Sequence, residues 1–129
     1  MTPDPIKRWH RVALEKLPAE IAPLLADDCV FESPVVHTPQ LGKAITTQYL
    51  QAALEVLNTV HFRYAAEWYG HDSAVLEFVT EIDGVKINGV DIIGWNEAGL
   101  ITHFKVMVRP LKAINTLHAK MAERLMKAG

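Results

Sequence analysis

The chain has 129 residues, of which half are hydrophobic and 22% charged, and its formal net charge at pH 7 is −2. This length and composition are typical of one globular domain whose core needs neither disulfides nor metal. We therefore predict a single domain over residues 1–129. Acidic and basic residues are interleaved without a basic stripe, which argues against nucleic acid as a partner.

The single cysteine, Cys29, excludes an intrachain disulfide and fits a reducing compartment. The first ten residues lack the apolar core of a signal peptide, and no apolar run reaches membrane-spanning length. We therefore expect a cytoplasmic protein that does not bind a membrane. The six histidines have no ligand-like spacing with acids or with the cysteine, so we expect no metal and no cofactor.

The first third of the chain predicts helices, because Asp4-Pro5 supplies a helix start and apolar residues follow at helical spacing. The predicted elements in chain order are a helix from Asp4, a short helix opened by Pro18, a strand over 29–33 and a helix over 43–57. From residue 60 onward the hydrophobic period changes to two, which is typical of strands.

Strands are predicted over residues 60–69, 73–82, 85–95 and 100–109, followed by a helix that begins at Pro110. Asp83-Gly84 is a strong hairpin signal between the second and third of these strands. Gly89 and Gly94 inside one strand predict β-bulges that bend the sheet. The pattern predicts an α+β domain in which helices cover one face of an antiparallel sheet.

Alternation along these strands separates two faces. One phase is apolar apart from a single charge, and its members are Leu76, Phe78, Thr80, Asp91, Ile93, Trp95, Phe104, Val106 and Val108. The other phase mixes acids on one strand with bases on another, and its members are Glu77, Glu81, His103, Lys105, Met107 and Arg109. We predict a concave apolar face under the helices and a charged outer face with room for a dimer interface.

Asp91 is the strongest candidate for chemistry. A carboxylate among apolar residues either finds a hydrogen-bond donor or has its pKa raised. Two interpretations remain open: a structural carboxylate bonded to the Trp9 indole or a helix N-terminus, and an acid, base or ligand anchor in a pocket. Trp9 and Tyr49 either pack in the core or line that pocket. His37 is either a solvated loop residue or a proton-transfer group at the pocket mouth.

The sequence resembles the nuclear transport factor 2-like superfamily, in particular its SnoaL-like and ketosteroid-isomerase-like branches. The resemblance spans roughly residues 6 to 109 and is carried by LLADDCVFESP at 24–34, Gly42, EIDG at 81–84, DIIGW at 91–95 and GLI at 99–101. It implies a cone in which a curved antiparallel sheet wraps around N-terminal helices, here with an additional C-terminal helix. It also implies an apolar pocket that opens at one end, and a homodimer.

Ketosteroid isomerases combine an aspartate base with an oxyanion hole made of a tyrosine and a protonated aspartic acid. By the resemblance, Asp91 matches the protonated acid, while Ser33 stands in the position of the base and Trp9 in that of the tyrosine. Serine cannot abstract a proton at neutral pH, and an indole donates a hydrogen bond but accepts none. We therefore do not expect ketosteroid isomerisation by the usual route.

The leading hypothesis is a small-molecule-binding cone with an apolar pocket and cofactor-independent isomerase, cyclase or hydratase activity through Asp91. The residues expected to contact the ligand are Trp9, Ser33, His37, Tyr49, Phe78, Trp95, Phe104, Val106 and Val108. The alternative is a non-catalytic ligand-binding or dimeric interaction module in which Asp91 is structural. The fold does not decide between them, because it hosts enzymes and binding proteins alike.

Overall fold

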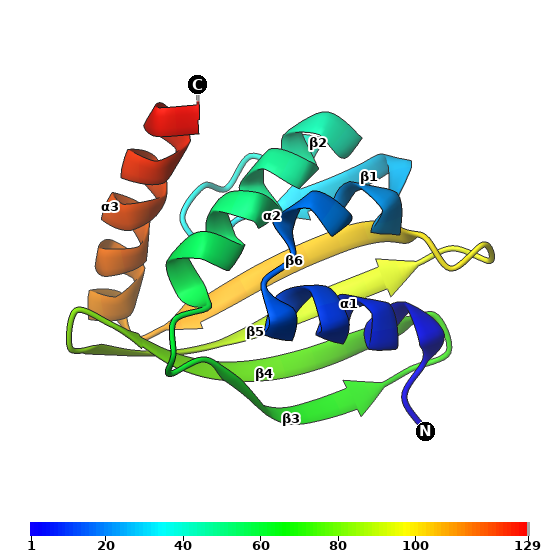
Figure 1. The fold of residues 1–129 in the computed structure, drawn as a ribbon, viewed down its shortest axis with the longest axis horizontal. Coiled ribbons are helices and arrows are strands. Elements are labelled where there is room, and N and C mark those ends of the chain that lie inside the picture. Colours follow the sequence, from blue (N-terminus) through cyan, green and yellow to red (C-terminus); the bar gives the residue numbers. More distant parts are fainter. Residues whose placement is uncertain (129) are drawn as a thin grey trace.

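The computed structural model describes residues 1–128 and shows one curved sheet with helices on its concave side (Figure 1). In chain order the elements are α1 (Asp4–Glu15), the 3₁₀ turns η1 (Pro18–Glu20) and η2 (Ala22–Leu24), β1 (Leu25–Glu32), β2 (Gln40–Leu41), α2 (Lys43–Leu57), β3 (Arg63–Tyr69), β4 (Ser73–Ile82), β5 (Val85–Trp95), β6 (Ile101–Arg109) and α3 (Leu111–Ala128). The predicted α+β class, with N-terminal helices and a closing C-terminal helix, is confirmed.

The six strands form one sheet in the order β2-β1-β6-β5-β4-β3. Strands β3 to β6 are the predicted antiparallel meander, in which each strand pairs with its neighbour in the chain. Strand β1 lies parallel to β6, and the two-residue strand β2 pairs with β1. These two pairings were not predicted, since alternation within a strand carries no information about its partner.

The segment after α1 differs from the predicted second helix. Pro18 opens a single 3₁₀ turn, a second such turn follows at Ala22–Leu24, and Leu25 already begins β1. Pro23 is the physical reason, because it lacks the N–H of an α-helical hydrogen bond and its ring clashes with the preceding turn. The first strand therefore starts four residues earlier than predicted.

The hairpin between β4 and β5 has the predicted two-residue turn. Asp83 and Gly84 both have positive φ, at 51° and 78°, as a type I′ turn requires. The bulge predicted at Gly89 is absent, because this residue pairs in unbroken register with Phe78 on β4 and Val108 on β6. A register shift does occur between Gly94 and Trp95 on the β6 side.

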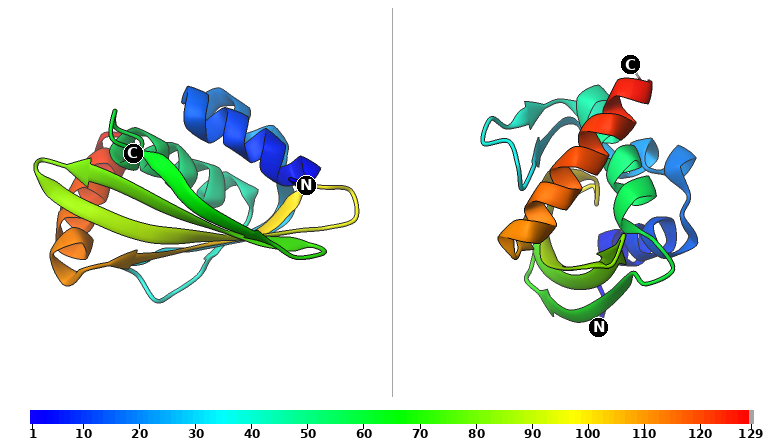
Figure 2. Two further views of the ribbon diagram at one scale, coloured as in Figure 1. Left: turned by 90° about the horizontal axis from the view of Figure 1, so that it is seen from below. Right: turned by 90° about the vertical axis from the view of Figure 1, so that its left-hand side faces the viewer.

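The predicted division of the sheet into two faces is confirmed. The inner-phase residues of β4, β5 and β6 are buried except for Trp95 and Val108, which are partly buried. Helices α1 and α2 lie on this face, while α3 stands across one end of the sheet (Figure 2). The inner face and the three helices thus enclose one hydrophobic core.

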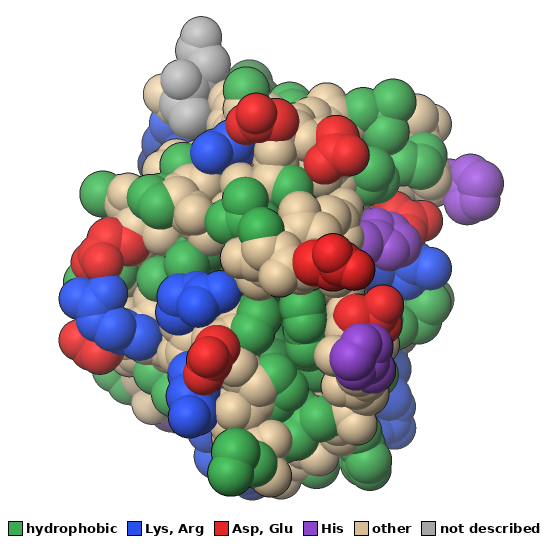
Figure 3. Space-filling view, turned by 90° about the vertical axis from the view of Figure 1, so that its right-hand side faces the viewer, with side chains coloured by type: hydrophobic (Ala, Val, Ile, Leu, Met, Phe, Trp, Pro, Cys, Tyr) green, Lys and Arg blue, Asp and Glu red, His purple; other side chains and the backbone are tan. Residues whose placement is uncertain are grey.

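At the end of the molecule opposite α3, acidic, basic and histidine side chains are mixed on the surface, with no patch of one sign (Figure 3). Within residues 1–128, no helix has the length and apolar character needed to cross a membrane.

Candidate functional site

An apolar cavity of about 200 Å³ lies between α2, α3, the sheet and the loop that follows β1. On α2 its wall is formed by Tyr49, Ala53 and Leu57, which are four residues apart and therefore share one helix face. The remaining lining residues are Phe31, Ser33, Pro34, Val35, Val36, Val106, Leu117, His118, Met121, Ala122 and Leu125. Because small alanines stand at 53 and 122, the two helices leave space between them.

A second, inner cavity of about 30 Å³ adjoins the main one, since both are lined by Ala53, Leu57 and Val106. Its other lining residues are Trp9, Leu50, Leu54, Asn58, Phe62, Tyr64, Phe78, Asp91 and Phe104. This volume accommodates a water molecule or one polar group of a ligand, but not the ligand's body. The wall of the inner cavity is largely apolar too, and Asp91 is its one ionisable carboxyl group.

A chain of two hydrogen bonds connects α1, β3 and β5 at this inner end. The indole Nε1–H of Trp9 donates to the Tyr64 hydroxyl at 2.8 Å, and that hydroxyl donates to Asp91 Oδ2, also at 2.8 Å. The donor groups of Trp9 and Tyr64 are therefore both in use. Neither structural partner considered for Asp91, the Trp9 indole or a helix N-terminus, binds it among residues 1–128; Tyr64 does, and it stands between Asp91 and the indole.

The other carboxyl oxygen of Asp91, Oδ1, accepts no hydrogen bond from residues 1–128. It is also not among the side-chain oxygens that are both fully enclosed and unpaired, which are those of Thr46 and Thr47. Since Asp91 lines the inner cavity, Oδ1 is the atom that a bound molecule can reach. Asp91 as a residue is only 6% exposed.

Burial raises the pKa of Asp91 from 3.8 to about 7, and the hydrogen bond from Tyr64 lowers it by a smaller amount. Its neighbours across the sheet are Leu76 and Val106, which are buried and apolar, so neither supplies a compensating positive charge. Burial also raises the pKa of Tyr64 well above its usual value, and the nearby Asp91 charge adds to this effect. Burial therefore moves the ionisation of Asp91 from acidic pH to about neutral pH.

No family model matches the sequence, and no curated protein matches it either. Solved structures do match. A steroid delta-isomerase from Pseudomonas aeruginosa is 29% identical with a TM-score of 0.91, and the match covers 96% of this chain and 90% of that one. An uncharacterized protein with a cystatin-like fold from Silicibacter pomeroyi is 30% identical with a TM-score of 0.88, covering 95% and 86%.

An NTF2-like protein of unknown function from Mesorhizobium loti is 20% identical with a TM-score of 0.72, and the match covers 83% of this chain and 89% of that one. The chain belongs to the nuclear transport factor 2-like superfamily. The curved sheet and the helices on its concave side form the cone of this fold, with Asp91 lining the inner cavity and α3 forming part of the wall of the main one.

Seven of the sequence-predicted site residues of this NTF2-like protein line the two cavities. Ser33, Tyr49 and Val106 line the main cavity, while Trp9, Phe78, Phe104, Val106 and Asp91 line the inner one. Three others lie elsewhere. His37 is exposed on the loop after β1, Val108 is partly buried against the core, and Trp95 borders a polar surface groove beside the turn at 96–99.

Glu32 does not supply a second carboxyl group to the cavity. Its Oε2 pairs with His103 Nε2 at 2.5 Å and with Lys105 Nζ at 3.5 Å. The hydrogen bond with His103 lowers the pKa of Glu32. The side chain therefore belongs to the outer face, as the alternation of β1 predicts, and Asp91 is the one carboxyl among the lining residues.

Two functional features were missed by sequence analysis. Tyr64 precedes a register shift in β3, so period-two alternation does not show that its hydroxyl reaches Asp91. Sequence analysis predicted α3 as a helix but not as a cavity wall, although Leu117, Met121 and Leu125 form an apolar stripe that needs a partner. The signal was present in that stripe, but nothing local indicates that a cavity lies behind it.

Proposed function

We propose that this protein binds a small, largely apolar molecule with a carbonyl group, and that Asp91 donates a hydrogen bond to the carbonyl oxygen. The observation that carries the proposal is Oδ1 of Asp91, which has no hydrogen-bond partner among residues 1–128 and belongs to a residue that lines the inner cavity. Because the pKa of this carboxyl is about 7, a substantial fraction holds a proton at neutral pH. A protonated acid can donate where a carboxylate can only accept.

The same geometry supports cofactor-independent turnover by isomerisation, cyclisation or hydration. In each case negative charge develops on the substrate oxygen, and a donor fixed in a dry site stabilises that charge more than water does. If the proton passes to the substrate, the remaining Asp91 carboxylate keeps the hydrogen bond from Tyr64. Ser33 lines the main cavity; its Oγ accepts the N–H of Val35, and its O–H remains available to a ligand or water.

The likeness to a steroid delta-isomerase supports the isomerase form of this proposal. That activity is a property of the Pseudomonas protein. In the present chain Ser33 stands where the ketosteroid-isomerase resemblance places the aspartate base. That position therefore holds no carboxylate to accept a proton. The alternative, a non-catalytic binder, is favoured by this single observation. Turnover and binding therefore need separate readouts.

The test uses 2-tetralone, a two-ring ketone with exchangeable hydrogens beside its carbonyl. Thermal unfolding measures binding, and NMR in D₂O measures deuterium incorporation at the carbons beside the carbonyl. Wild type is compared with Asp91→Leu, which has the shape of aspartate without a donor, and with Asp72→Leu, which replaces an exposed carboxylate outside both cavities. A ligand at a hundred times its Kd adds about 2.7 kcal/mol to stability.

We expect 2-tetralone to stabilise wild type and Asp72→Leu, and to stabilise Asp91→Leu less, because leucine has no group that donates to the carbonyl. Faster exchange in wild type than in Asp91→Leu would identify an enzyme, whereas binding without exchange would identify a binding protein. Equal stabilisation of wild type and Asp91→Leu would contradict the role given to Asp91. No stabilisation of wild type would contradict the pocket itself.

We further propose that two copies associate through the outer face of the sheet. The centre of this face is an apolar patch formed by Trp68, Val75, Val90, Ile92 and Met107, of which Trp68 and Met107 are more than half exposed. Charges of both signs surround it, including Glu77 and Lys105. In a two-fold interface the patch of one copy packs against the same patch of the other copy. Because the charges around the patch have both signs, acidic residues of one copy can meet basic residues of the other.

A further inference from the structure

The volume of the two cavities limits the size of the ligand. The main cavity measures about 200 Å³ and the inner one about 30 Å³. A protein cavity of about 150 Å³ lined by aliphatic and aromatic side chains holds one benzene molecule. By this comparison, the main cavity suits a molecule of one or two rings, and the inner cavity takes no more than one polar group of it. A four-ring molecule would extend far outside it.

His118 lines the main cavity and is exposed, whereas Asp91 lines the inner cavity and is buried. On α3 the cavity wall consists of the stripe Leu117, Met121 and Leu125 and of the adjacent pair His118 and Ala122. Leu117 and Met121 are buried, whereas His118 and Ala122 are exposed. The second row therefore marks the rim of the cavity, where its interior meets solvent.

The imidazole of His118 is free to bind a ligand. His10 and His103 use Nε2 to bind Glu67 and Glu32, whereas His118 forms no hydrogen bond or ion pair with residues 1–128. The other polar side chains of the main cavity are more constrained. Ser33 Oγ accepts the N–H of Val35 at 3.1 Å, and the Tyr49 ring packs on Phe31 with 5.4 Å between ring centroids.

We infer that the ligand is a one- or two-ring apolar molecule with an oxygen function at each end, and that His118 forms a hydrogen bond with the outer oxygen. The inference rests on the proposed function, because it assigns the inner oxygen to Asp91. It adds a substrate class and a specificity-determining residue on α3. Between the two ends the wall is almost entirely apolar, so a polar group in the middle of the ligand would lose its hydration without a partner.

Imidazole suits the rim position chemically. A neutral imidazole has one donor and one acceptor nitrogen, so His118 can bind either a hydroxyl or a carbonyl oxygen. A hydrogen bond of this kind contributes modestly, and roughly a three- to tenfold gain in affinity is expected from it. The gain appears only when the ligand carries the second oxygen.

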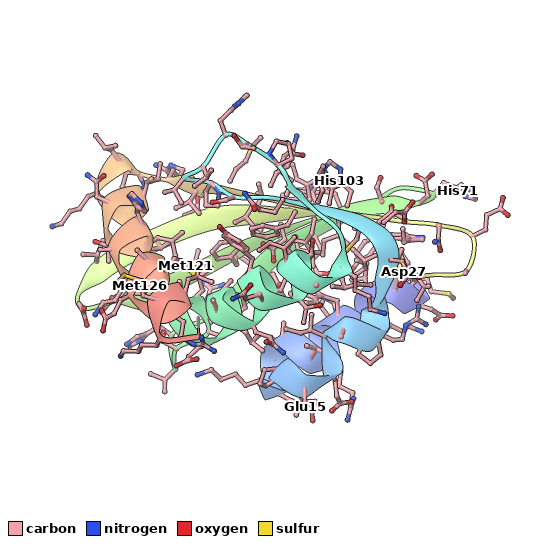
Figure 4. All side chains as sticks on the ribbon, turned by 90° about the horizontal axis from the view of Figure 1, so that it is seen from above. Glu15, Asp27, His71, His103, Met121 and Met126 are labelled. Carbon is pink, nitrogen blue, oxygen red and sulfur yellow. The ribbon has the colours of Figure 1, made fainter. Side chains whose placement is uncertain are left out.

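Two fluorescent probes of the same size test this inference. The first is 2-naphthol, which has one hydroxyl group, and the second is naphthalene-2,6-diol, which has one at each end. Both are titrated into wild type, His118→Leu and Asp91→Leu. His71→Leu is the matched control, because His71 lies at the end of the molecule opposite α3, whose Met121 and Met126 are labelled in Figure 4.

For wild type and His71→Leu we expect the diol to bind more tightly than 2-naphthol, beyond the twofold statistical advantage of two equivalent ends. In His118→Leu this extra gain disappears, while 2-naphthol binds as in wild type. His118 is exposed, so the variant is expected to fold. Tyr49→Phe removes another hydroxyl of the cavity wall that could bind the outer oxygen. This variant should keep the extra affinity of the diol.

Two results would overturn the inference while leaving the proposed function intact. One is that the diol binds wild type no more than twofold more tightly than 2-naphthol. The other is that the extra affinity of the diol survives in His118→Leu or disappears in Tyr49→Phe. By contrast, 2-naphthol that fails to bind wild type, or binds Asp91→Leu equally well, would contradict the proposed function itself and the inference with it.

Discussion

Gly89 lies directly under the aromatic ring of Phe78. A Cβ atom added at Gly89 would stand 2.5 Å from Phe78 Cζ and 2.6 Å from the carbonyl oxygen of Met107. The glycine is needed for space rather than for backbone conformation, because it pairs regularly within β5. The ring that it accommodates stacks on Phe62 at 5.5 Å and lines the inner cavity beside Asp91.

Replacing Gly89 with alanine should therefore displace Phe78, since the backbone carbonyl of Met107 cannot move aside. Overpacking of this kind costs typically about 1–3 kcal/mol, and we expect that loss in urea unfolding of Gly89→Ala. Gly94→Ala is the matched control in the same strand, where the nearest atom to the new Cβ is 3.7 Å away. Equal stability of the two variants would contradict the close approach.

Tyr64→Phe tests the hydrogen-bond chain. The change removes the acceptor of the Trp9 indole and the donor to Asp91, leaving two polar groups unpaired. We expect a loss of about 1–3 kcal/mol in unfolding free energy. The pKa of Asp91 should rise further above 7, because the Tyr64 hydrogen bond lowers it. Carboxyl ¹³C NMR measures that titration directly.

The control for Tyr64→Phe is Tyr69→Phe on the same strand. The Tyr69 hydroxyl donates to Glu67 at the exposed edge of the sheet and does not contact Asp91. The pKa of Asp91 in Tyr69→Phe should therefore equal that in wild type. An unchanged or lowered Asp91 pKa in Tyr64→Phe would show that the hydroxyl does not bind the ionised carboxylate.

Much of this fold could be predicted because its signals are local. The period-two alternation of β4 to β6 and the Asp83-Gly84 turn fixed the hairpin and both sheet faces, and so placed Asp91 on the buried side. Helix α2 begins and ends where its apolar stripe predicts. In each case the residues that carry the signal lie within one element or one turn.

The missed features depend on which elements meet in space. The partner of Asp91 is Tyr64, 27 residues away on a strand with a register shift, and not the indole that sequence analysis considered. Likewise, sequence analysis singled out Gly89 inside its strand but attributed it to a bulge. The reason for the glycine is the space occupied by the Phe78 ring, which lies on another strand. His118 was passed over because a histidine on a basic helix looks solvated until the cavity behind that helix is known.

Met107→Asp tests the proposed dimer. Met107 is 52% exposed in the centre of the apolar patch on the outer face. A buried, unpaired carboxylate on each side of a two-fold interface would oppose association. We expect wild type to sediment as a dimer in analytical ultracentrifugation and Met107→Asp as a monomer. Leu41→Asp, at a 73% exposed apolar residue on β2, should remain dimeric. A monomeric wild type would refute the interface.

The raised pKa of Asp91 makes a prediction about stability and pH. In the folded protein the pKa is about 7, whereas an unfolded aspartate has a pKa near ~3.9. Between these values the folded state holds a proton that the unfolded state has released. Stability therefore falls as pH rises through this window, and the penalty is fully present above the folded pKa. At 1.36 kcal/mol per pKa unit, it amounts to about 4 kcal/mol at most.

Asp91→Asn removes this penalty, because its amide oxygen can still accept the Tyr64 hydrogen bond and carries no charge at any pH. We expect the variant to be more stable than wild type at pH 8, by about 1–4 kcal/mol, with the advantage shrinking steadily as the pH is lowered to 4.5. Urea unfolding across this range gives the difference curve. Asp72→Asn, which changes an exposed carboxylate, should give a nearly flat one. A flat curve for Asp91→Asn, or one in which wild type gains with rising pH, would mean that Asp91 is ionised throughout and cannot donate to a ligand.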